Sequence, residues 1–348
     1  MPTIQADKLR ELAAQLLMAA GASEEEAAIV SRHSIGANLA GHDSHGIILI
    51  PTYIDRIKRG HIVPGAPFQI VQETANSTVV DGNWGFGYVV SERVMAMTIE
   101  KARTGAVAAA TILRQSHIGR VADYPLMAAS AGMIGLMTAD SGRSAKTVAP
   151  FGGKEARLGT NPICIAMPSD LEAPMFIDMA TSAVAAGKLN VARTRGYSIP
   201  EGWILDKEGN PTTDPAAGGV ALPLGGSEGH KGYGLSAMVE ILSGILPGLG
   251  FGHDPSGRHN DGCFLAVFNV EAFRPLDEFK REVKEFAGYL TSTPPQAGFE
   301  RVYYPGELEY LSAQRLGRDG IQIEDTTWAR LGDLAGEFGL PRELMEDK

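Results

Sequence analysis

The stretch Ala106-Val107-Ala108-Ala109-Ala110-Thr111-Ile112-Leu113 opens the part of the sequence that decides the fold. A short apolar run of this kind is typical of a buried strand. A helix is expected next, over about 121–131, and a second strand over 133–139. A strand, a helix and a strand in this order predict an α/β protein.

The residues on both sides extend this architecture. Further strands are expected at 68–71, 77–80, 162–167, 175–179 and 263–270, and helices at 89–103, 231–246 and 276–290. The segment 196–208 contains Pro200 and Trp203 and leads into Asp206-Lys207-Glu208-Gly209. This pattern predicts a hairpin or a lid-like excursion.

Both ends of the chain are predicted to be helical. Leucines recur at helical spacing over 5–20. Ser23 and Glu26 have the spacing of a capping box, which predicts the start of a second helix. Further helices are expected over 47–57 and 326–339.

Composition narrows the class of protein. The chain has 348 residues, with 31 basic and 41 acidic side chains, and this acidic balance argues against nucleic acid or an anionic membrane as partner. Cys164 and Cys263 lie in apolar runs, so neither a disulfide framework nor a cysteine-rich zinc site is expected. No signal h-region and no apolar run of about 18 residues is present, which predicts a cytoplasmic protein without a membrane span.

Two common nucleotide-binding fingerprints are missing. Neither Gly85-Phe86-Gly87 nor Gly248-Leu249-Gly250 is followed by the third glycine of G-x-G-x-x-G. Gly187-Lys188 has Ser182 where a Walker A motif has its first glycine. Any nucleotide must therefore be held by another scaffold.

The run Gly41-His42-Asp43-Ser44-His45-Gly46 is the first candidate for chemistry. A histidine beside Ser and Asp can have its tautomer fixed by one neighbour while its other nitrogen transfers a proton. The alternative is a polar loop in which Asp43 or Ser44 caps the following helix. A serine-protease interpretation is weaker, because no G-x-S-x-G elbow is present.

Four more stretches are candidates for ligand binding, and three of them combine glycines with polar residues. Ser116-His117-Ile118-Gly119-Arg120 follows a strand and either presents backbone N–H groups to a phosphate or forms an ordinary turn. The stretches 151–162 and 178–182 adjoin expected strands and are candidate binding loops. The alternative for 151–162 is a surface turn, and the alternative for 178–182 is a helix N-cap. In 225–234, five glycines surround His230-Lys231 at the start of a helix, which favours an anionic ligand as much as a flexible loop.

Metal binding receives little support from the sequence. The eight histidines show no metal-ligand spacing. His253-Asp254 and His259-Asn260-Asp261 can ligate a metal jointly, but a solvated glycine-rich loop is the expectation there.

Taken together, these motifs resemble the malate/L-lactate dehydrogenase family, which is unrelated to the Rossmann dehydrogenases. Its members include ureidoglycolate, sulfolactate and diketogulonate oxidoreductases and piperideine-2-carboxylate reductases. The matching segments follow the family's order over almost the whole chain: Asp43-Ser44-His45-Gly46 with Tyr53 and Gly60, His117-Ile118-Gly119, Leu158-Gly159-Thr160-Asn161-Pro162, Asp178-Met179-Ala180-Thr181-Ser182, Gly229-His230-Lys231-Gly232-Tyr233-Gly234 and Tyr304-Pro305-Gly306-Glu307.

The resemblance implies an α/β fold with a non-Rossmann, mixed and mostly antiparallel sheet that binds the nucleotide. A helical domain from both chain ends is expected at 1–65 with 310–348. The sheet domain is expected at 66–309, with an inserted helical segment near 225–292. The resemblance further implies NAD or NADP as cofactor, a small-molecule substrate, a homodimer, and reversible reduction of a 2-oxo acid or a related C=N bond.

The resemblance also assigns roles to residues. It makes His45 the proton donor and acceptor and Ser44 its orienting partner, although His117 can also take the catalytic role. Thr160 is the expected substrate contact, and no metal site is implied. The expected cofactor contacts are His117, Ile118, Gly119, Arg120, Val121, Asp178, Met179, Ala180, His230, Lys231, Tyr304, Pro305, Gly306 and Glu307.

Two positions depart from the family pattern. The family often carries an arginine four residues after the histidine, where it can pair with the substrate carboxylate, and Leu49 stands there. Lys188 lies near the place where some relatives have an acid. With Leu49, the chain looks most like the hydroxycarboxylate dehydrogenase branch.

Other functions stay open at this point. Within the same family, the alternatives are a cyclic imine reductase and a ureidoglycolate-type dehydrogenase. Outside it, they are a nucleotide-binding protein without chemistry and a metal-dependent hydrolase that uses His42, Asp43 and His45.

Overall fold

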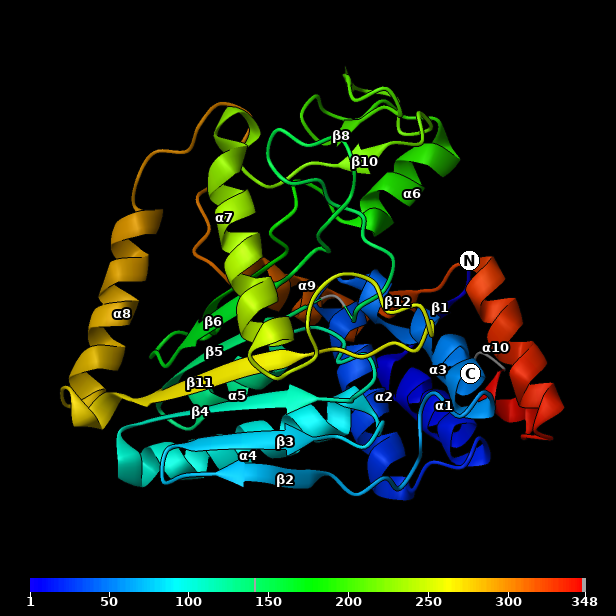
Figure 1. Cartoon of the computed structure of the whole chain (residues 1–348), viewed down its shortest axis with the longest axis horizontal. Helices are drawn as coiled ribbons and strands as arrows, with labels where there is room; N and C mark the ends of the chain where they lie inside the picture. The colour runs from blue at the N-terminus through cyan, green and yellow to red at the C-terminus, as the bar shows by residue number, and fades with distance from the viewer. Residues whose placement is uncertain (141, 346–348) are drawn as a thin grey trace.

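A seven-stranded sheet forms the centre of the computed structural model, which describes residues 1–140 and 142–345 (Figure 1). The strand order is β2-β3-β4-β11-β5-β6-β7. β3 and β4 pair in parallel, and the other neighbouring pairs are antiparallel. The expected mixed, mostly antiparallel sheet is therefore confirmed. Its strands are β2 Gln69–Glu73, β3 Ser77–Asp81, β4 Val107–Leu113, β5 Met133–Ala139, β6 Ile163–Met167, β7 Met175–Met179 and β11 Cys263–Asn269.

The middle strands are buried because helices cover both faces of the sheet. Ala108 and Ala110 of β4 stand opposite Val267 and Leu265 of β11, and all four belong to one apolar core. Helices α4 (Gly87–Gly105) and α5 (Asp123–Ser130) pack on one face, and helix α7 (Gly229–Glu240) crosses the other (Figure 1). Small alanine side chains let these layers approach closely.

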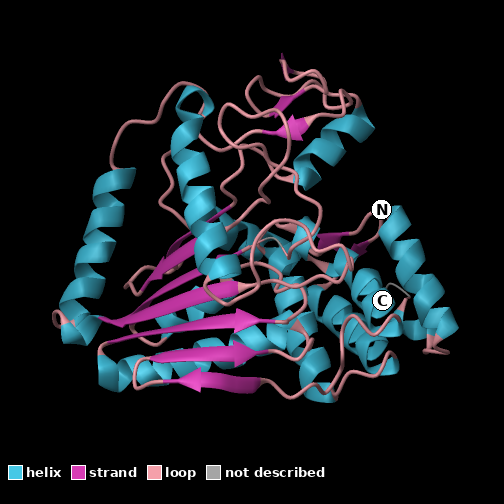
Figure 2. Cartoon of the chain, viewed as in Figure 1, coloured by secondary structure: helices cyan, strands magenta, loops and turns pink. Residues whose placement is uncertain are grey.

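Both chain ends join a helical layer at one end of the sheet (Figure 2). The capping box is confirmed, because Glu26 N donates to Ser23 Oγ at 3.2 Å and Ser23 N donates to Glu26 Oε2 at 3.0 Å. The strand from the N-terminus pairs with the strand that precedes the last helix. The layer contains α1 Ala6–Ala19, α2 Glu24–Leu39, α3 Ile50–Lys58, α10 Asp325–Glu337, β1 Thr3–Ile4 and β12 Ile321–Gln322.

A smaller lobe stands above the sheet (Figure 1). Its short strands β8 (Ile204–Leu205), β9 (Pro211–Thr212) and β10 (Val220–Ala221) form a three-stranded antiparallel sheet. The hairpin expected after residue 196 lies here. Helix α6 (Ala186–Arg195), which belongs to this lobe, was not predicted from the sequence.

The remaining helices lie around the main sheet. α7 continues into a π-helical turn at Ile241–Ile245. α8 (Leu276–Thr291) follows β11, which is the strand expected at 263–270. α9 (Glu307–Asp319) packs against α2. None of the described helices is long and apolar enough to cross a membrane.

Candidate active site

His45 lies on a short turn between α2 and α3. The Asn38 side chain shapes this turn, because it donates to Asp43 Oδ1 at 2.7 Å and accepts from Ile47 N at 2.8 Å. Gly46 is required by this arrangement, since a Cβ there would lie 2.2 Å from Asn38 Oδ1. Ser44 Oγ lies 3.0 Å from His45 Nδ1, which orients the ring and leaves Nε2 for other contacts.

His117 lies on the loop between β4 and α5, and two tyrosines support it. Tyr53 Oη is 2.7 Å from His117 Nδ1 and 2.9 Å from Tyr88 Oη. The Gly119 N–H also donates to Nδ1, at 3.3 Å. Nδ1 is therefore an acceptor here, and the neutral ring carries its proton on Nε2. Gly119 fits this place because its φ is +72° and a Cβ would lie 2.2 Å from the Tyr88 ring.

The structure brings the two candidate histidines together. Their rings are stacked, with centroids 5.7 Å apart. Burial lowers the pKa of His117 to about 3, against the opposing charge of Asp261. Burial and the neighbouring His42 also lower the pKa of His45. Both imidazoles are therefore neutral near pH 7 in the unliganded chain.

Asp261 adds a buried carboxylate that was not predicted as part of this site. Its Oδ2 accepts from Ile118 N at 3.0 Å, and its Oδ1 lies 2.9 Å from His259 Nε2. Burial acts to raise the pKa of Asp261, but His259, His117 and the Ile118 N–H outweigh it and hold the pKa at about 2. The His259 ring in turn lies 5.4 Å from that of His117. The expectation of a solvated loop at 259–261 was therefore wrong.

The start of α5 holds several of the expected cofactor contacts. Asp178, at the end of β7, accepts from Ala122 N at 2.9 Å, and burial raises its pKa to about 6. Arg120 donates through Nε to Asp123 Oδ1 at 2.9 Å. Asp123 also lies 2.9 Å from His33 Nδ1, so Arg120 is already ion-paired within the chain.

Thr160 lies beside the segment that follows β7. Thr181 N donates to Thr160 O at 2.8 Å, and Leu224 N donates to Thr181 O at 2.9 Å. Asn161 donates to Glu240 Oε2 at 2.8 Å. The stretches 158–162 and 178–182 and the segment that leads into α7 are therefore held side by side.

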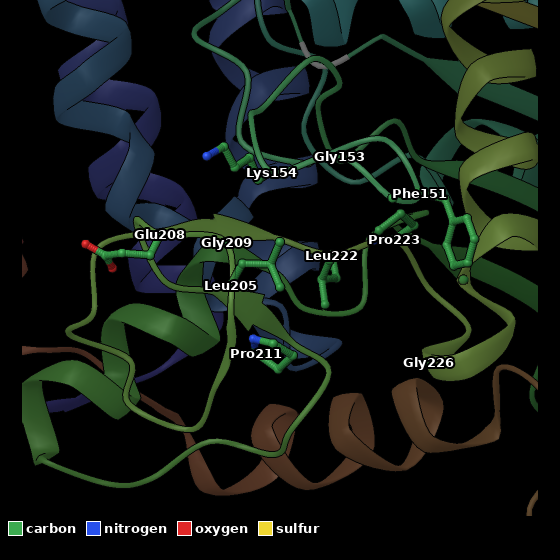
Figure 3. A pocket seen from close by; sticks show the side chains of 12 residues that line it. Phe151, Gly153, Lys154, Leu205, Glu208, Gly209, Pro211, Leu222, Pro223 and Gly226 are labelled. Carbon is green, nitrogen blue, oxygen red and sulfur yellow. The ribbon is translucent and has the colours of Figure 1, made fainter.

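His230 and Lys231 lie in the first turn of α7. Lys231 Nζ is 3.1 Å from Glu228 Oε2, and the His230 ring lies 5.7 Å from that of Phe151. Phe151 also lines a cavity of about 460 Å³ between the small lobe and the start of α7 (Figure 3). Among the described residues, no hydrogen bond, ion pair or ring contact joins this pair to His45 or His117.

The segment 304–307 is fixed along the edge of the main sheet. Phe176 N of β7 donates to Pro305 O at 3.3 Å, and Arg301 donates to Glu307 Oε1 at 2.8 Å. Gly306 has a φ of +92°, and a Cβ there would lie 2.4 Å from Pro174 O. Leu49, by contrast, packs partly buried against the helical core.

Several residues beside the histidines escaped the sequence analysis. Tyr53 was noted only as part of a motif, His259 and Asp261 only as possible metal ligands, and Tyr88 carried no local signal that marked it as part of this site. Cys164 and Cys263 are free and buried, as expected. The described residues contain no group of three or more His, Cys, Asp or Glu side chains placed to hold a metal.

Comparisons with known proteins show what the chain is similar to. The family model for malate/L-lactate dehydrogenase matches residues 4–332. The malate dehydrogenase of Pyrococcus horikoshii is 37% identical over 345 residues, which cover 96% of this chain and 95% of that protein. Hydroxycarboxylate dehydrogenase B of Escherichia coli K12 is 35% identical over 334 residues, which cover 94% and 91%.

Solved structures show the same fold. The crystal structure of malate dehydrogenase from Entamoeba histolytica has a TM-score of 0.92 at 35% identity and covers 98% of this chain and 99% of its own. The crystal structure of delta1-piperideine-2-carboxylate reductase from Pseudomonas syringae has a TM-score of 0.84 at 29% identity, with 96% and 100% covered.

Proposed function

Because the chain belongs to the malate/L-lactate dehydrogenase family and is a 2-hydroxyacid dehydrogenase, we propose that it transfers a hydride between NAD or NADP and C2 of a 2-hydroxy acid or 2-oxo acid. The observation that carries this proposal is the stacking of His45 and His117, 5.7 Å apart. Members of the family are nicotinamide-dependent, and the cofactor supplies the hydride when bound. The residues of this chain have to orient the substrate and move one proton.

We assign the proton transfer to His45. Ser44 Oγ, 3.0 Å from Nδ1, orients the ring so that Nε2 is free for the substrate oxygen. In the oxidative direction the neutral ring accepts the hydroxyl proton, which suits its lowered pKa. In the reductive direction the protonated ring donates to the oxygen as it becomes alkoxide-like. Such general acid–base catalysis is typically worth about 10²–10⁴-fold.

His117 has a different role from His45 in this proposal. With a pKa of about 3 it holds no positive charge at neutral pH. Because its Nδ1 accepts from Gly119 N, the ring has an Nε2–H to donate to the substrate oxygen. A fixed hydrogen bond of this kind stabilises negative charge that develops on the oxygen during reduction.

The start of α7 fits an anionic cofactor. The backbone N–H groups of its first turn and the exposed Lys231 suit a pyrophosphate. We therefore propose that 117–121, 178–180, 230–231 and 304–307 contact NAD or NADP, and that Thr160 contacts the substrate. These segments come from the α5 loop, the end of β7, the start of α7 and the start of α9.

A spectrophotometric assay tests the proposed function. Oxidation of NADH or NADPH is followed at the reduced-nicotinamide absorbance band with a panel of 2-oxo acids. The panel includes Δ1-piperideine-2-carboxylate, because one structural neighbour is a reductase of that compound. Turnover of 2-oxo acids is expected. Turnover of the cyclic imine alone would make the chain an imine reductase, and no turnover of any compound would leave a nucleotide-binding protein without chemistry.

We also propose that the chain forms a homodimer and is cytoplasmic, as the family resemblance implies. Met238, Ile245 and Leu246 expose apolar side chains on α7 and its π-helical end, and such a patch fits a partner surface. Light scattering on the purified chain is expected to give the mass of a dimer, and a monomer would contradict this.

A further inference from the structure

One nitrogen of the half-buried Arg56 guanidinium lacks a hydrogen-bond partner among the described residues. Its Nη1 is buried and makes no hydrogen bond with the described residues. Its neighbours on α3 differ, because Lys58 pairs with Glu337 at 2.6 Å and Asp55 pairs with Arg330 at 3.2 Å. A buried N–H donor without an acceptor is costly, so such a group in a native protein points to a ligand.

Arg56 lies one helical turn after Tyr53 on α3. Residues 49, 53 and 56 follow helical spacing and share one face of the helix. Tyr53, in the middle of this face, reaches Nδ1 of His117 at 2.7 Å. Burial is the main cause of the pKa shifts of both Tyr53 and His117, and the charge of Arg56 acts on both groups by lowering their pKa values. The guanidinium therefore lies within electrostatic range of Tyr53 and His117.

Other cations near the site are already engaged. Arg120 pairs with Asp123. Arg258 donates to His61 O at 3.2 Å and to Gly60 O at 2.9 Å, and its guanidinium lies 3.7 Å from the centre of the Trp84 ring. Lys146 pairs with Glu240 at 3.2 Å, and both side chains are buried. Arg56 differs from these three cations, because its Nη1 has no hydrogen-bond partner among the described residues.

We propose that Arg56 binds the carboxylate of the substrate and thereby places C2 and its oxygen before His45 and His117. This rests on the proposed function. A planar guanidinium can bind a carboxylate through two parallel hydrogen bonds, which fixes the orientation of the acid as well as its position. On the same helix face, Leu49 offers no charge and adds an apolar wall. The substrate is then a monocarboxylic 2-hydroxy or 2-oxo acid whose C1 carboxylate pairs with Arg56.

Substrate pairs with and without a carboxylate test this assignment. Arg56→Gln and Arg56→Lys are compared with wild type on phenylpyruvate and on its methyl ester. The matched control is Arg59→Gln, which removes the same charge from an exposed position at the end of α3. For Arg56→Gln, kcat/KM for the acid is expected to fall by about 10- to 150-fold, mainly through KM, as the loss of a charged hydrogen bond predicts. The ester should change little, Arg56→Lys should retain part of the activity, and Arg59→Gln should match wild type.

Oxamate binding gives a readout without turnover. Thermal melting of the NADH-bound enzyme with oxamate, a nonreactive 2-oxo acid analogue, should show stabilisation of wild type and Arg59→Gln but not of Arg56→Gln. Melting without oxamate reports whether each variant is folded. Equal losses on acid and ester, or full stabilisation of Arg56→Gln by oxamate, would overturn the role of Arg56 while turnover by wild type upholds the proposed function. A wild-type enzyme that reduces no 2-oxo acid would instead overturn the proposed function.

Discussion

The hydroxyl of Tyr53 lies 2.7 Å from Nδ1 of His117, so a helix from the N-terminal end of the chain orients a ring on the loop that follows strand β4. Tyr88 continues this contact, with its hydroxyl 2.9 Å from that of Tyr53. Burial raises the pKa of Tyr88 to about 12 and the pKa of Tyr53 well above its usual value. Both groups are therefore neutral hydrogen-bonding partners at any working pH.

Tyr53→Phe should lower kcat without changing the affinity for the cofactor. The substitution keeps the ring but removes the hydroxyl that contacts His117 Nδ1, which leaves that nitrogen only the longer hydrogen bond from Gly119 N. Loss of one hydrogen bond costs about 0.5–1.5 kcal/mol. Steady-state kinetics with a 2-oxo acid and a fluorescence titration of NADH measure the two quantities. Tyr310→Phe is a suitable control, because its hydroxyl contacts Glu172 at the surface. An unchanged kcat in Tyr53→Phe would show that His117 needs no orientation.

His45→Ala is expected to abolish turnover and to leave the Kd for NADH nearly unchanged. The variant loses the group assigned to proton transfer, which typically contributes about 10²–10⁴-fold. His117→Ala should retain more activity, because it removes a hydrogen bond to the oxygen and not the proton carrier. If His45→Ala keeps a kcat near wild type while His117→Ala is inactive, the two roles are reversed.

Lys231→Ala should raise the Kd for the cofactor, at a cost of about 1.5–3 kcal/mol for a lost charge-assisted hydrogen bond. In the unliganded chain this lysine is 71% exposed and pairs with Glu228, a surface contact that contributes little to stability. Its charge is therefore free to turn to a phosphate. Fluorescence titration with NADH measures the change, and Lys284→Ala on α8 serves as control. An unchanged Kd would mean that the glycine-rich turn binds something else.

Features that depend on neighbouring residues could be predicted from the sequence. The capping box at Ser23 and Glu26 and the contact between Ser44 and His45 form within a few residues of each other. The strands were predictable because a short apolar run fits a buried strand in most contexts. The family resemblance supplied His45 and His117 as candidates for the catalytic role, but the stacking of their rings was not predicted.

Contacts between distant parts of the chain could not be predicted. The Asp261 carboxylate accepts a hydrogen bond from the N–H of Ile118, which lies 143 positions earlier in the chain. The polar and glycine residues around Asp261 are typical of a solvated loop. Arg56 has the sequence context of an exposed, charged helix end, and only the packing of α3 brings its charge close enough to act on His117. Few of the described apolar side chains of helix α6 are buried. Its sequence therefore lacks the apolar stripe from which a helix can be predicted.

The free energy of unfolding should depend on pH through His33. This buried ring lies 2.9 Å from Asp123 and 2.5 Å from Glu92, and hydrogen bonds to the two acids outweigh burial and raise its pKa. Because the pKa of His33 is higher in the folded state, its contacts stabilise the fold fully at pH values below the pKa of the unfolded state, about 6.5. This stabilisation is lost as the pH rises through the pKa of the folded state. His33→Gln should cost about 3–5 kcal/mol at pH 6 and clearly less at pH 9, measured by urea unfolding. An equal cost at both pH values would contradict this.

Leu49→Arg should move substrate preference toward dicarboxylic acids. Leucine cannot bind a second carboxylate, and its side chain packs on the helical core beside the site. Wild type is therefore expected to prefer 2-oxo acids with an apolar or aromatic side chain, such as phenylpyruvate, over oxaloacetate. An apolar contact is worth about 1–3 kcal/mol, so the preference should be graded, and kcat/KM for both substrates in wild type and variant measures it. Ile48→Arg, an exposed neighbour, controls for charge. If wild type reduces oxaloacetate far better than phenylpyruvate, Leu49 does not set specificity.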